Sequence, residues 1–207
     1  MARRAIPKKV EEAKQRIITA AFDIAAAEGL SQFTLSKVAA KAGITKAGIY
    51  WYFESKEALL NEMALVLREA FAGPARSALQ GQLSAKERME FLVNALSGED
   101  RLRDCTLILK IYFEAKENYP FIKSVIQDGY REFLAIVTAV FEEGIKNGEL
   151  KTGMGADCLA RFFVASLDAC VIQGEMLGNE GHDLRTFCSL FFAAFDGQER
   201  KEEACEG

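Results

Sequence analysis

The sequence predicts an all-helical protein with about nine helices and no sheet. Apolar residues recur at intervals of three and four positions, which is the spacing of one face of an α-helix. Residues typical of helix caps separate these segments, and no segment alternates apolar and polar residues for long enough to form a strand. The 207 residues are 50% hydrophobic and include only three prolines, so the chain can bury a core and has few helix breakers.

The first predicted helix runs from about Lys8 to Ala27. Its apolar face consists of Val10, Ala13, Ile17, Ala20, Ala21, Ile24 and Ala25. Gly29 comes directly after Glu28 and can adopt the left-handed conformation that commonly ends a helix.

Two short helices are predicted next, at residues 35–41 and 46–53. Thr34 and Thr45 precede them, and each hydroxyl can accept a hydrogen bond from a free N–H group in the first turn of its helix. Gly43 lies in the turn between them. Two short helices joined by a turn that contains glycine are typical of a helix-turn-helix, whose second helix enters the major groove of DNA.

The remaining helices are predicted to be longer. Ser55 can cap a helix that Gly73 and Pro74 either kink or end, because proline lacks an N–H group and clashes one turn back. Ser84 and Glu87 have the spacing of a capping box. Further helices are expected at 101–117, 121–147, 156–177 and 183–196, followed by a flexible polar tail at 198–207.

Charge is distributed unevenly along the chain. Residues 1–56 carry ten Lys or Arg and five Asp or Glu, a net charge of +5, whereas the remainder carries 16 basic and 25 acidic residues, a net charge of −9. A basic N-terminal quarter on an acidic body is expected of a chain that meets a polyanion at one end.

Several functional classes lack their usual sequence signals. No run of about 18 uncharged apolar residues predicts a membrane span, and no apolar segment follows the basic N-terminus as in a secretory signal, so we expect a cytoplasmic protein. The chain has one histidine and no C-x-x-C pair, so no metal or other cofactor is expected. Phosphate-binding glycine loops and a nucleophile elbow are missing too, and we therefore expect no enzyme.

The outward side of the second short helix is the candidate DNA-reading surface. Its residues are Thr45, Lys46, Ala47, Tyr50 and Trp51. Nearby hydroxyl and ammonium groups can contact phosphates and fix the docking position, and these belong to Thr34, Tyr52 and Lys56. For Tyr50 and Tyr52, packing in the core is the alternative.

Residues 33–56 resemble the DNA-binding signature of the TetR/AcrR family of transcriptional regulators. The matching positions are Gly43-Ile44-Thr45, Ile49-Tyr50, Tyr52-Phe53 and Ser55-Lys56. The long helix before them and the helical body after them also fit the layout of that family. The resemblance implies a three-helix DNA-binding domain at 1–56 and a larger ligand-binding and dimerisation domain at 57–197.

The resemblance also implies a homodimer whose two N-terminal domains enter successive major grooves of a palindromic operator, and repression that a bound ligand relieves. Carried over by position, it assigns DNA contacts to the eight residues named above. Gly48 departs from the bulkier residue common in the family, and a mid-helix glycine costs about 1 kcal/mol against alanine. Arg3 and Arg4 form either a minor-groove arm or a basic start that lies outside the complex.

The last two predicted helices are unusually apolar and indicate a dimer. Phe191 and Phe192 are adjacent and point about 100° apart on a helix, so one small core would not cover both. A second copy of the chain would cover them in a four-helix interface with two-fold symmetry. The alternative is deep burial within one chain. The predicted interface residues are Phe162, Phe163, Leu167, Cys170, Phe187, Phe191 and Phe195.

The middle helices supply the candidate effector pocket. In the family this region encloses an inducer, and we assign it here to Leu107, Ile111, Tyr112, Phe121, Tyr130 and Phe133. For each of these residues, plain core packing is the alternative. Their aromatic and aliphatic side chains favour a small apolar effector, whose identity the sequence does not give.

The sequence therefore predicts a ligand-responsive transcriptional regulator, most consistent with a repressor, that binds double-stranded operator DNA as a homodimer. A helical small-molecule-binding protein whose helix-turn-helix no longer binds DNA is the alternative. Salt-dependent operator binding would separate the two, because phosphate contacts make affinity fall steeply with salt. An enzyme is the weakest interpretation.

Overall fold

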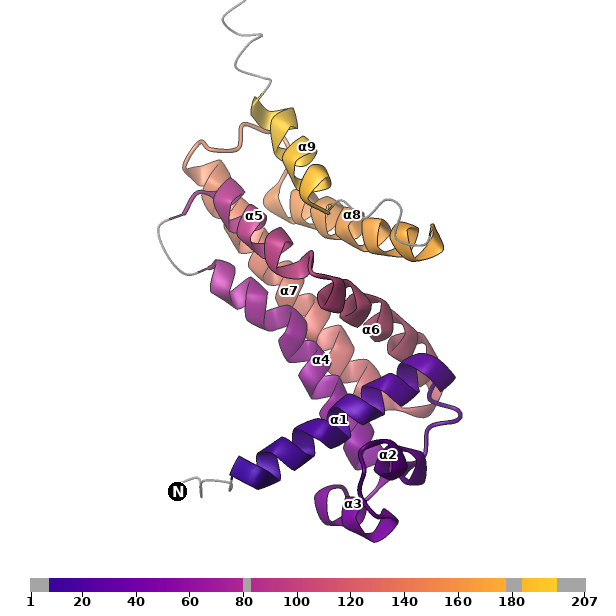
Figure 1. The fold of residues 1–207 in the computed structure, drawn as a ribbon. Coiled ribbons are helices and arrows are strands. Elements are labelled where there is room, and N and C mark those ends of the chain that lie inside the picture. The colour runs from indigo at the N-terminus through magenta and orange to yellow at the C-terminus, as the bar shows by residue number, and fades with distance from the viewer. Residues whose placement is uncertain (1–7, 80–82, 178–183, 197–207) are drawn as a thin grey trace, which may run out of the picture. The chain divides into compact units, whose positions relative to one another are not determined.

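In the computed structural model of the protein, the residues described are 8–79, 83–177 and 184–196. Over these ranges the chain forms nine helices and no strand, which confirms the all-helical prediction (Figure 1). The predicted tail at 198–207 and the possible arm at Arg3 and Arg4 lie outside the described residues. The helices are α1 (Lys8–Glu28), α2 (Leu35–Lys41), α3 (Lys46–Tyr52), α4 (Lys56–Ala78), α5 (Ala85–Leu96), α6 (Glu99–Asn118), α7 (Pro120–Lys146), α8 (Ala156–Met176) and α9 (Leu184–Asp196).

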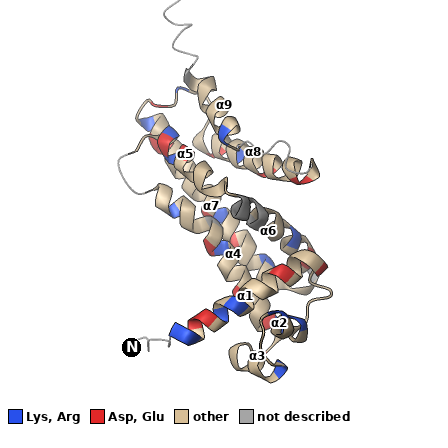
Figure 2. Ribbon diagram, in the orientation of Figure 1, with Lys and Arg blue, Asp and Glu red and all other residues tan. Residues whose placement is uncertain are grey.

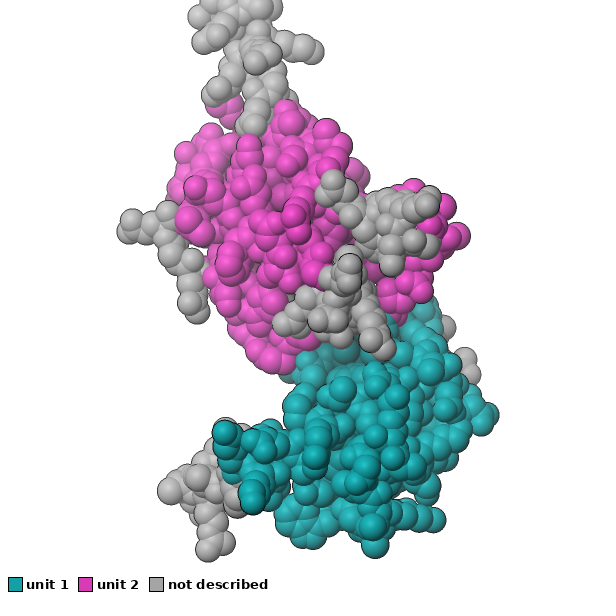
Figure 3. Space-filling view, in the orientation of Figure 1, with its two compact units in different colours: residues 1–68, 107–127 teal, residues 69–106, 128–207 magenta. Residues whose placement is uncertain are grey.

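The described residues pack into two compact units (Figure 3). Unit 1 runs to Arg68 and includes residues 107–127, whereas unit 2 combines residues 69–106 with the chain from Asp128 onward. Helices α4, α6 and α7 each contribute residues to both units. The predicted boundary at residue 56 divides the chain by role rather than by packing, and it stays a prediction.

The core of unit 1 forms around the apolar face of α1. Six of the seven residues expected on that face are buried, and Val10 is half-buried. From Ile17 onward, these residues pack in one cluster with the fully buried side chains of Val38, Ile49 and Leu59. Gly29 ends the helix with a φ of 76°, in the left-handed region that glycine enters without strain. Burial of one helical face thus joins α1 to the three helices that follow it.

The predicted helix caps are present. The side chain of Thr34 accepts a hydrogen bond from the N–H of Lys37 at 3.3 Å, and that of Thr45 accepts one from the N–H of Gly48 at 2.9 Å. At the start of α4, Ser55 accepts from Ala58 N–H at 3.0 Å. Ser84 and Glu87 form the expected capping box of α5. Four helix starts therefore follow from local side-chain chemistry.

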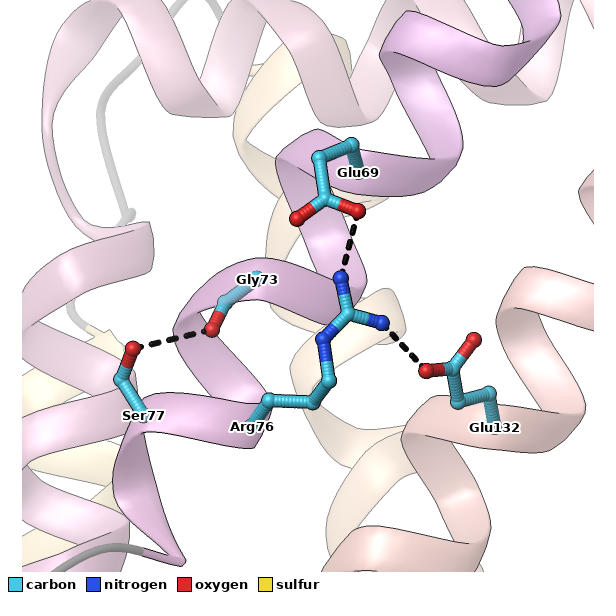
Figure 4. A network of polar contacts seen from close by, with 5 residues as sticks. All are labelled: Glu69, Gly73, Arg76, Ser77 and Glu132. Atoms are coloured by element: carbon cyan, nitrogen blue, oxygen red, sulfur yellow. Dashed lines mark hydrogen bonds and ion pairs between the residues drawn. The ribbon is translucent and has the colours of Figure 1, made fainter. Parts of the chain in front are cut away.

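Helix α4 continues past Pro74 to Ala78, so of the two predicted outcomes an end at Gly73 and Pro74 is wrong. An arginine braces this segment: the guanidinium of Arg76 donates to Glu69 one turn before the proline and to Glu132 on α7 (Figure 4). The charge-assisted bond between Glu69 and Arg76 spans Pro74, where the backbone lacks an N–H donor, and so stabilises the helix there.

The core of unit 2 is dominated by phenylalanine. The ring of Phe163 lies 5.6 Å from that of Phe141 and 4.9 Å from that of Phe191, both in edge-to-face geometry. Phe192 adds a further edge contact to Phe191 at 5.3 Å. Such pairs favour one arrangement of α7, α8 and α9 beyond what area burial alone provides. Among the described helices, none is both long enough and apolar enough to cross a membrane.

Candidate functional site

Helices α2 and α3 form the predicted helix-turn-helix. The turn between them closes through a hydrogen bond from the N–H of Ile44 to the carbonyl of Ala39 at 3.0 Å. Gly43 has a φ of 70°, and a Cβ atom at this position would meet nothing within 4 Å. The turn therefore requires glycine for its backbone conformation rather than for space. The apolar side chains of the motif, Val38, Ala39, Ile44, Ile49 and Phe53, all belong to the core of unit 1 or pack against it.

The outer face of α3 is exposed over every residue predicted to read DNA. Thr45, Lys46, Ala47, Tyr50 and Trp51 are exposed, whereas Ile49 on the opposite face is completely buried. Trp51 is 69% exposed, and the centre of its ring lies 4.7 Å from that of Tyr52 in edge-to-face geometry. A solvent-facing tryptophan and tyrosine on a seven-residue helix form a surface suited to a partner. Their contact with DNA stays a prediction.

Gly48, the position that departs from the family pattern, lies beside the cap of α3. A Cβ atom there would lie 3.1 Å from the Thr45 hydroxyl oxygen, which accepts the hydrogen bond from the N–H of Gly48 itself. A side chain at residue 48 would crowd this cap, so the glycine preserves a tight helix start.

The three residues predicted to contact phosphate differ in their surroundings. Thr34 is exposed and Tyr52 is half-buried. Lys56 is half-buried, and its ammonium donates to the carbonyl of Leu30 at 2.9 Å. The same ammonium lies 5.8 Å from the ring centre of Phe33 and 5.6 Å from that of Tyr119. Sequence patterns do not reveal this internal role, because the contacting residues are distant in the chain.

Basic and acidic residues are interspersed along α1 (Figure 2), and several basic side chains of unit 1 are paired with acids. Lys14 pairs with Glu62, Lys37 with Glu28 and Lys41 with Asp23. Among the described ion pairs, none includes Lys9, Arg16 or Lys46, and all three side chains are exposed. Lys9 and Arg16 line a surface hollow of about 980 Å³ along α1 and the end of α2. Unpaired, exposed cations are the groups that bind phosphate most readily. Lys9 and Arg16 are therefore further candidates for phosphate contact beside Lys46, and the motif alone did not single out these two.

The predicted effector-pocket residues are divided between the units. Leu107, Ile111, Tyr112 and Phe121 belong to unit 1, and Tyr130 and Phe133 belong to unit 2. Leu107, Ile111 and Phe133 are buried in the two cores. Phe121 and Tyr130 are 50% and 46% exposed, and the hydroxyl of Tyr130 donates to Asp168 at 2.7 Å. Burial raises the pKa of the Asp168 carboxyl. The assignment of the pocket stays a prediction.

The predicted dimer residues differ in exposure. Phe163, Leu167 and Phe191 are buried within unit 2, whereas Cys170, Phe187 and Phe195 are half-buried and Phe162 is 58% exposed. A stripe of small and apolar side chains, which we call the α8 stripe, is exposed along one side of that helix. It consists of Cys158, Phe162, Ala165, Ala169, Ile172 and Met176. These positions recur at alternating intervals of four and three, the spacing of a helix-packing seam. Sequence reasoning missed most of the stripe, because α8 is apolar on several sides.

In the parts of the chain that the structure describes, no group of three or more His, Cys, Asp or Glu side chains is placed to hold a metal ion. Burial raises the pKa of the Cys188 thiol to about 11, which keeps that thiol protonated and weakly nucleophilic at neutral pH.

Comparisons with known proteins agree with this architecture. A family model described as "Bacterial regulatory proteins, tetR family" matches residues 17–63, which include α2 and α3. The fatty acid metabolism regulator protein of Bacillus subtilis is 25% identical over 173 residues, covering 82% of this chain and 86% of that protein. The regulator SrpR of Pseudomonas putida is 46% identical over 48 residues, 23% of this chain and 22% of its own length.

Among solved structures, FadR from Bacillus subtilis in complex with stearoyl-CoA has the same fold, with a TM-score of 0.68 at 23% identity. The similarity covers 87% of this chain and 96% of that one. The helix-turn-helix match and the full-length helical relatives lead to the same conclusion. Residues 17–63 match the tetR family of bacterial regulatory proteins, and the longer relatives support a transcriptional regulator of the TetR/AcrR type.

Proposed function

We propose that this regulator binds a palindromic operator as a homodimer and represses transcription until a small molecule releases it. The observation that supports this most directly is the outer face of α3, where an exposed tyrosine, tryptophan and lysine project from a helix capped at its start and anchored by a buried isoleucine. A regulator of this kind would act in the cytoplasm, where bacterial DNA lies.

In this proposal α3 enters the major groove. Lys46, Tyr50 and Trp51 contact base edges and adjacent phosphates, because a helix start in the groove brings its first residues closest to the bases. Thr34 and Tyr52, together with the exposed Lys9 and Arg16, add backbone contacts that fix the docking position without reading sequence. The positive charge of the N-terminal region would raise the rate of encounter with DNA.

Replacing Lys46 or Tyr50 with alanine should weaken operator binding about tenfold, as expected for the loss of one groove contact. Neither change should alter helicity or dimerisation, since both side chains are exposed. The measurement is a fluorescence-anisotropy titration against a duplex selected by the protein from a random library. Lys146→Ala, a change at an exposed lysine of unit 2, serves as the control. Wild-type affinity in both α3 variants would remove these residues from the interface.

The α8 stripe supports the homodimer. Phe162 is 58% exposed, Ile172 47% and Met176 80%, and Leu190 on α9 is 67% exposed. Contiguous apolar surface of this kind marks protein interfaces, and a seam spaced by three and four residues fits another helix. Two copies of α8 and α9 would form a four-helix interface with two-fold symmetry.

The effector class is proposed from the relatives. The Bacillus subtilis regulator with the full-length match is a fatty acid metabolism regulator, and FadR from that organism was crystallised with stearoyl-CoA. We therefore propose a long-chain acyl thioester as the effector of this chain. An acyl chain agrees with the small apolar ligand expected from the sequence, and the thioester adds a polar head group.

Stearoyl-CoA should weaken operator binding about tenfold or more if it favours a dimer that no longer matches the operator. The measurement adds stearoyl-CoA at increasing concentration to the protein–operator complex, with free coenzyme A and stearate in parallel. Release by stearoyl-CoA alone would support the thioester. No release at any concentration below micelle formation would remove this class, and operator binding by the free protein would still test the regulator itself.

The absence of salt-dependent operator binding would favour the alternative of a ligand-binding protein without DNA contact.

A further inference from the structure

The turn between α1 and α2 is held by charged side chains from two other helices. The N–H of Leu30 donates to the Glu114 carboxylate at 2.5 Å, and the carbonyl of Leu30 accepts from the Lys56 ammonium at 2.9 Å. Lys110 donates to the carbonyl of Ala26 at 2.5 Å. All these residues belong to unit 1. We call Lys56, Lys110 and Glu114 the Leu30 clamp.

The clamp satisfies backbone groups that the end of α1 leaves without helical partners. The carbonyl of Ala26 lies in the last turn of the helix, where carbonyl groups commonly lack a helical N–H donor. A lysine at this end also interacts favourably with the helix dipole. Lys110 and Glu114 are four residues apart on α6, so both reach the turn from one face of that helix. Opposite charges thus hold the two backbone polar groups of Leu30, its N–H and its carbonyl.

Gly29 fits the same arrangement. Its φ of 76° favours glycine, and a Cβ atom there would lie 2.9 Å from a carboxylate oxygen of Glu114. A side chain at residue 29 would displace Glu114 from the N–H of Leu30. The backbone conformation and the carboxylate therefore depend on one another.

The clamped peptide lies directly before the DNA-binding motif. Leu30 and Phe33 are 2% and 1% exposed, and Thr34, the next residue, caps α2. Because α2 packs on α3 through the Gly43 turn, the position of residue 30 fixes where both helices begin. We propose that Glu114, Lys110 and Lys56 are positioning residues for operator binding, which hold the helix-turn-helix in the orientation that fits the groove. This inference rests on the proposed DNA binding.

For Lys56 the inference competes with the direct phosphate contact that the sequence predicts. The two roles have different salt dependence. Loss of one phosphate contact reduces the slope of log affinity against log salt by about one unit. Loss of a positioning contact lowers affinity and leaves that slope unchanged, because the number of phosphates neutralised stays the same.

The test compares Glu114→Ala, Glu114→Gln and Lys56→Met on the full chain. Operator affinity is measured over a range of salt concentrations, and amide hydrogen exchange is followed over residues 29–34 without DNA. Glu114→Ala should bind the operator about tenfold more weakly, in line with the loss of a charge-assisted hydrogen bond, with an unchanged salt slope and faster exchange in the turn. Glu114→Gln keeps an acceptor oxygen and should recover most of the affinity. Glu142→Gln, at an exposed position of α7, should match the wild type.

Wild-type affinity and wild-type exchange in Glu114→Ala would overturn the clamp. A reduced slope of log affinity against log salt in Lys56→Met would exclude Lys56 from the Leu30 clamp and support its contact with phosphate. If Glu114→Ala lowers the stability of the whole protein, the distribution of faster hydrogen exchange decides the matter, since a general loss of folding would not be confined to residues 29–34. Hydrogen exchange needs no DNA, so absence of operator binding in the wild type would count against the proposed function without obscuring the clamp.

Discussion

Replacing Phe163 with alanine is expected to lower the free energy of unfolding by about 3–5 kcal/mol, the range found when a large aromatic side chain is removed from a packed core. Phe163 is completely buried. Its ring contacts those of Phe141, Phe187 and Phe191 at centre distances of 5.6, 5.3 and 4.9 Å. These neighbours belong to two other helices, α7 and α9, and cannot all move inward to fill the space, so the variant should retain a cavity.

Urea unfolding followed by circular dichroism measures this loss. Because the proposed dimerisation would be linked to folding, wild type and variant must be compared at the same protein concentration. Phe91→Ala is the matched control, since it removes the same side chain from a residue of unit 2 that is 47% exposed and lies outside the α8 stripe. A loss below about 1 kcal/mol in Phe163→Ala would mean that the site collapses or is not packed as described.

Replacing Phe162 with glutamate is expected to leave the chain folded but to prevent dimerisation, so that the variant is a monomer. The side chain lies on the α8 stripe, where the proposed interface would bury a charge without a partner, and such burial costs several kcal/mol. Operator affinity should then fall about a hundredfold or more, because one chain binds a half-site without the gain from its linked partner. Sedimentation equilibrium at micromolar concentration measures the change, and far-ultraviolet circular dichroism checks that helicity is retained.

Glu175→Gln is the control for the charge change, because residue 175 is exposed on the same helix but off the stripe. It should sediment as the wild type does. A Phe162→Glu variant that remains dimeric would place the interface elsewhere on the chain.

The helices of this protein could be predicted from its sequence because their signals are local. Thr34, Thr45, Ser55 and Ser84 each cap a helix through a hydrogen bond to a backbone group three residues along. The exposed face of α3 also followed from local periodicity, since Ile49 alone of its residues is fully buried.

Contacts between distant segments could not be predicted in this way. The bond from Leu30 to Glu114 spans 84 residues and that from Lys56 to Leu30 spans 26, so nothing in the motif distinguished an internal lysine from one that faces solvent. Phe162 and Phe163 show the same limit. Helix α8 is apolar on several sides, and only the packing of α7 and α9 determines which phenylalanine is buried.

The single anchor of α3 has a consequence for how such regulators diversify. Since Ile49 alone is fully buried in this helix, the exposed positions Lys46, Ala47, Tyr50 and Trp51 can be exchanged with little penalty in folding. Target preference is thereby separated from the integrity of the scaffold. A set of outward side chains transplanted from a relative should redirect the protein to a new promoter while its sensing half is left as it is.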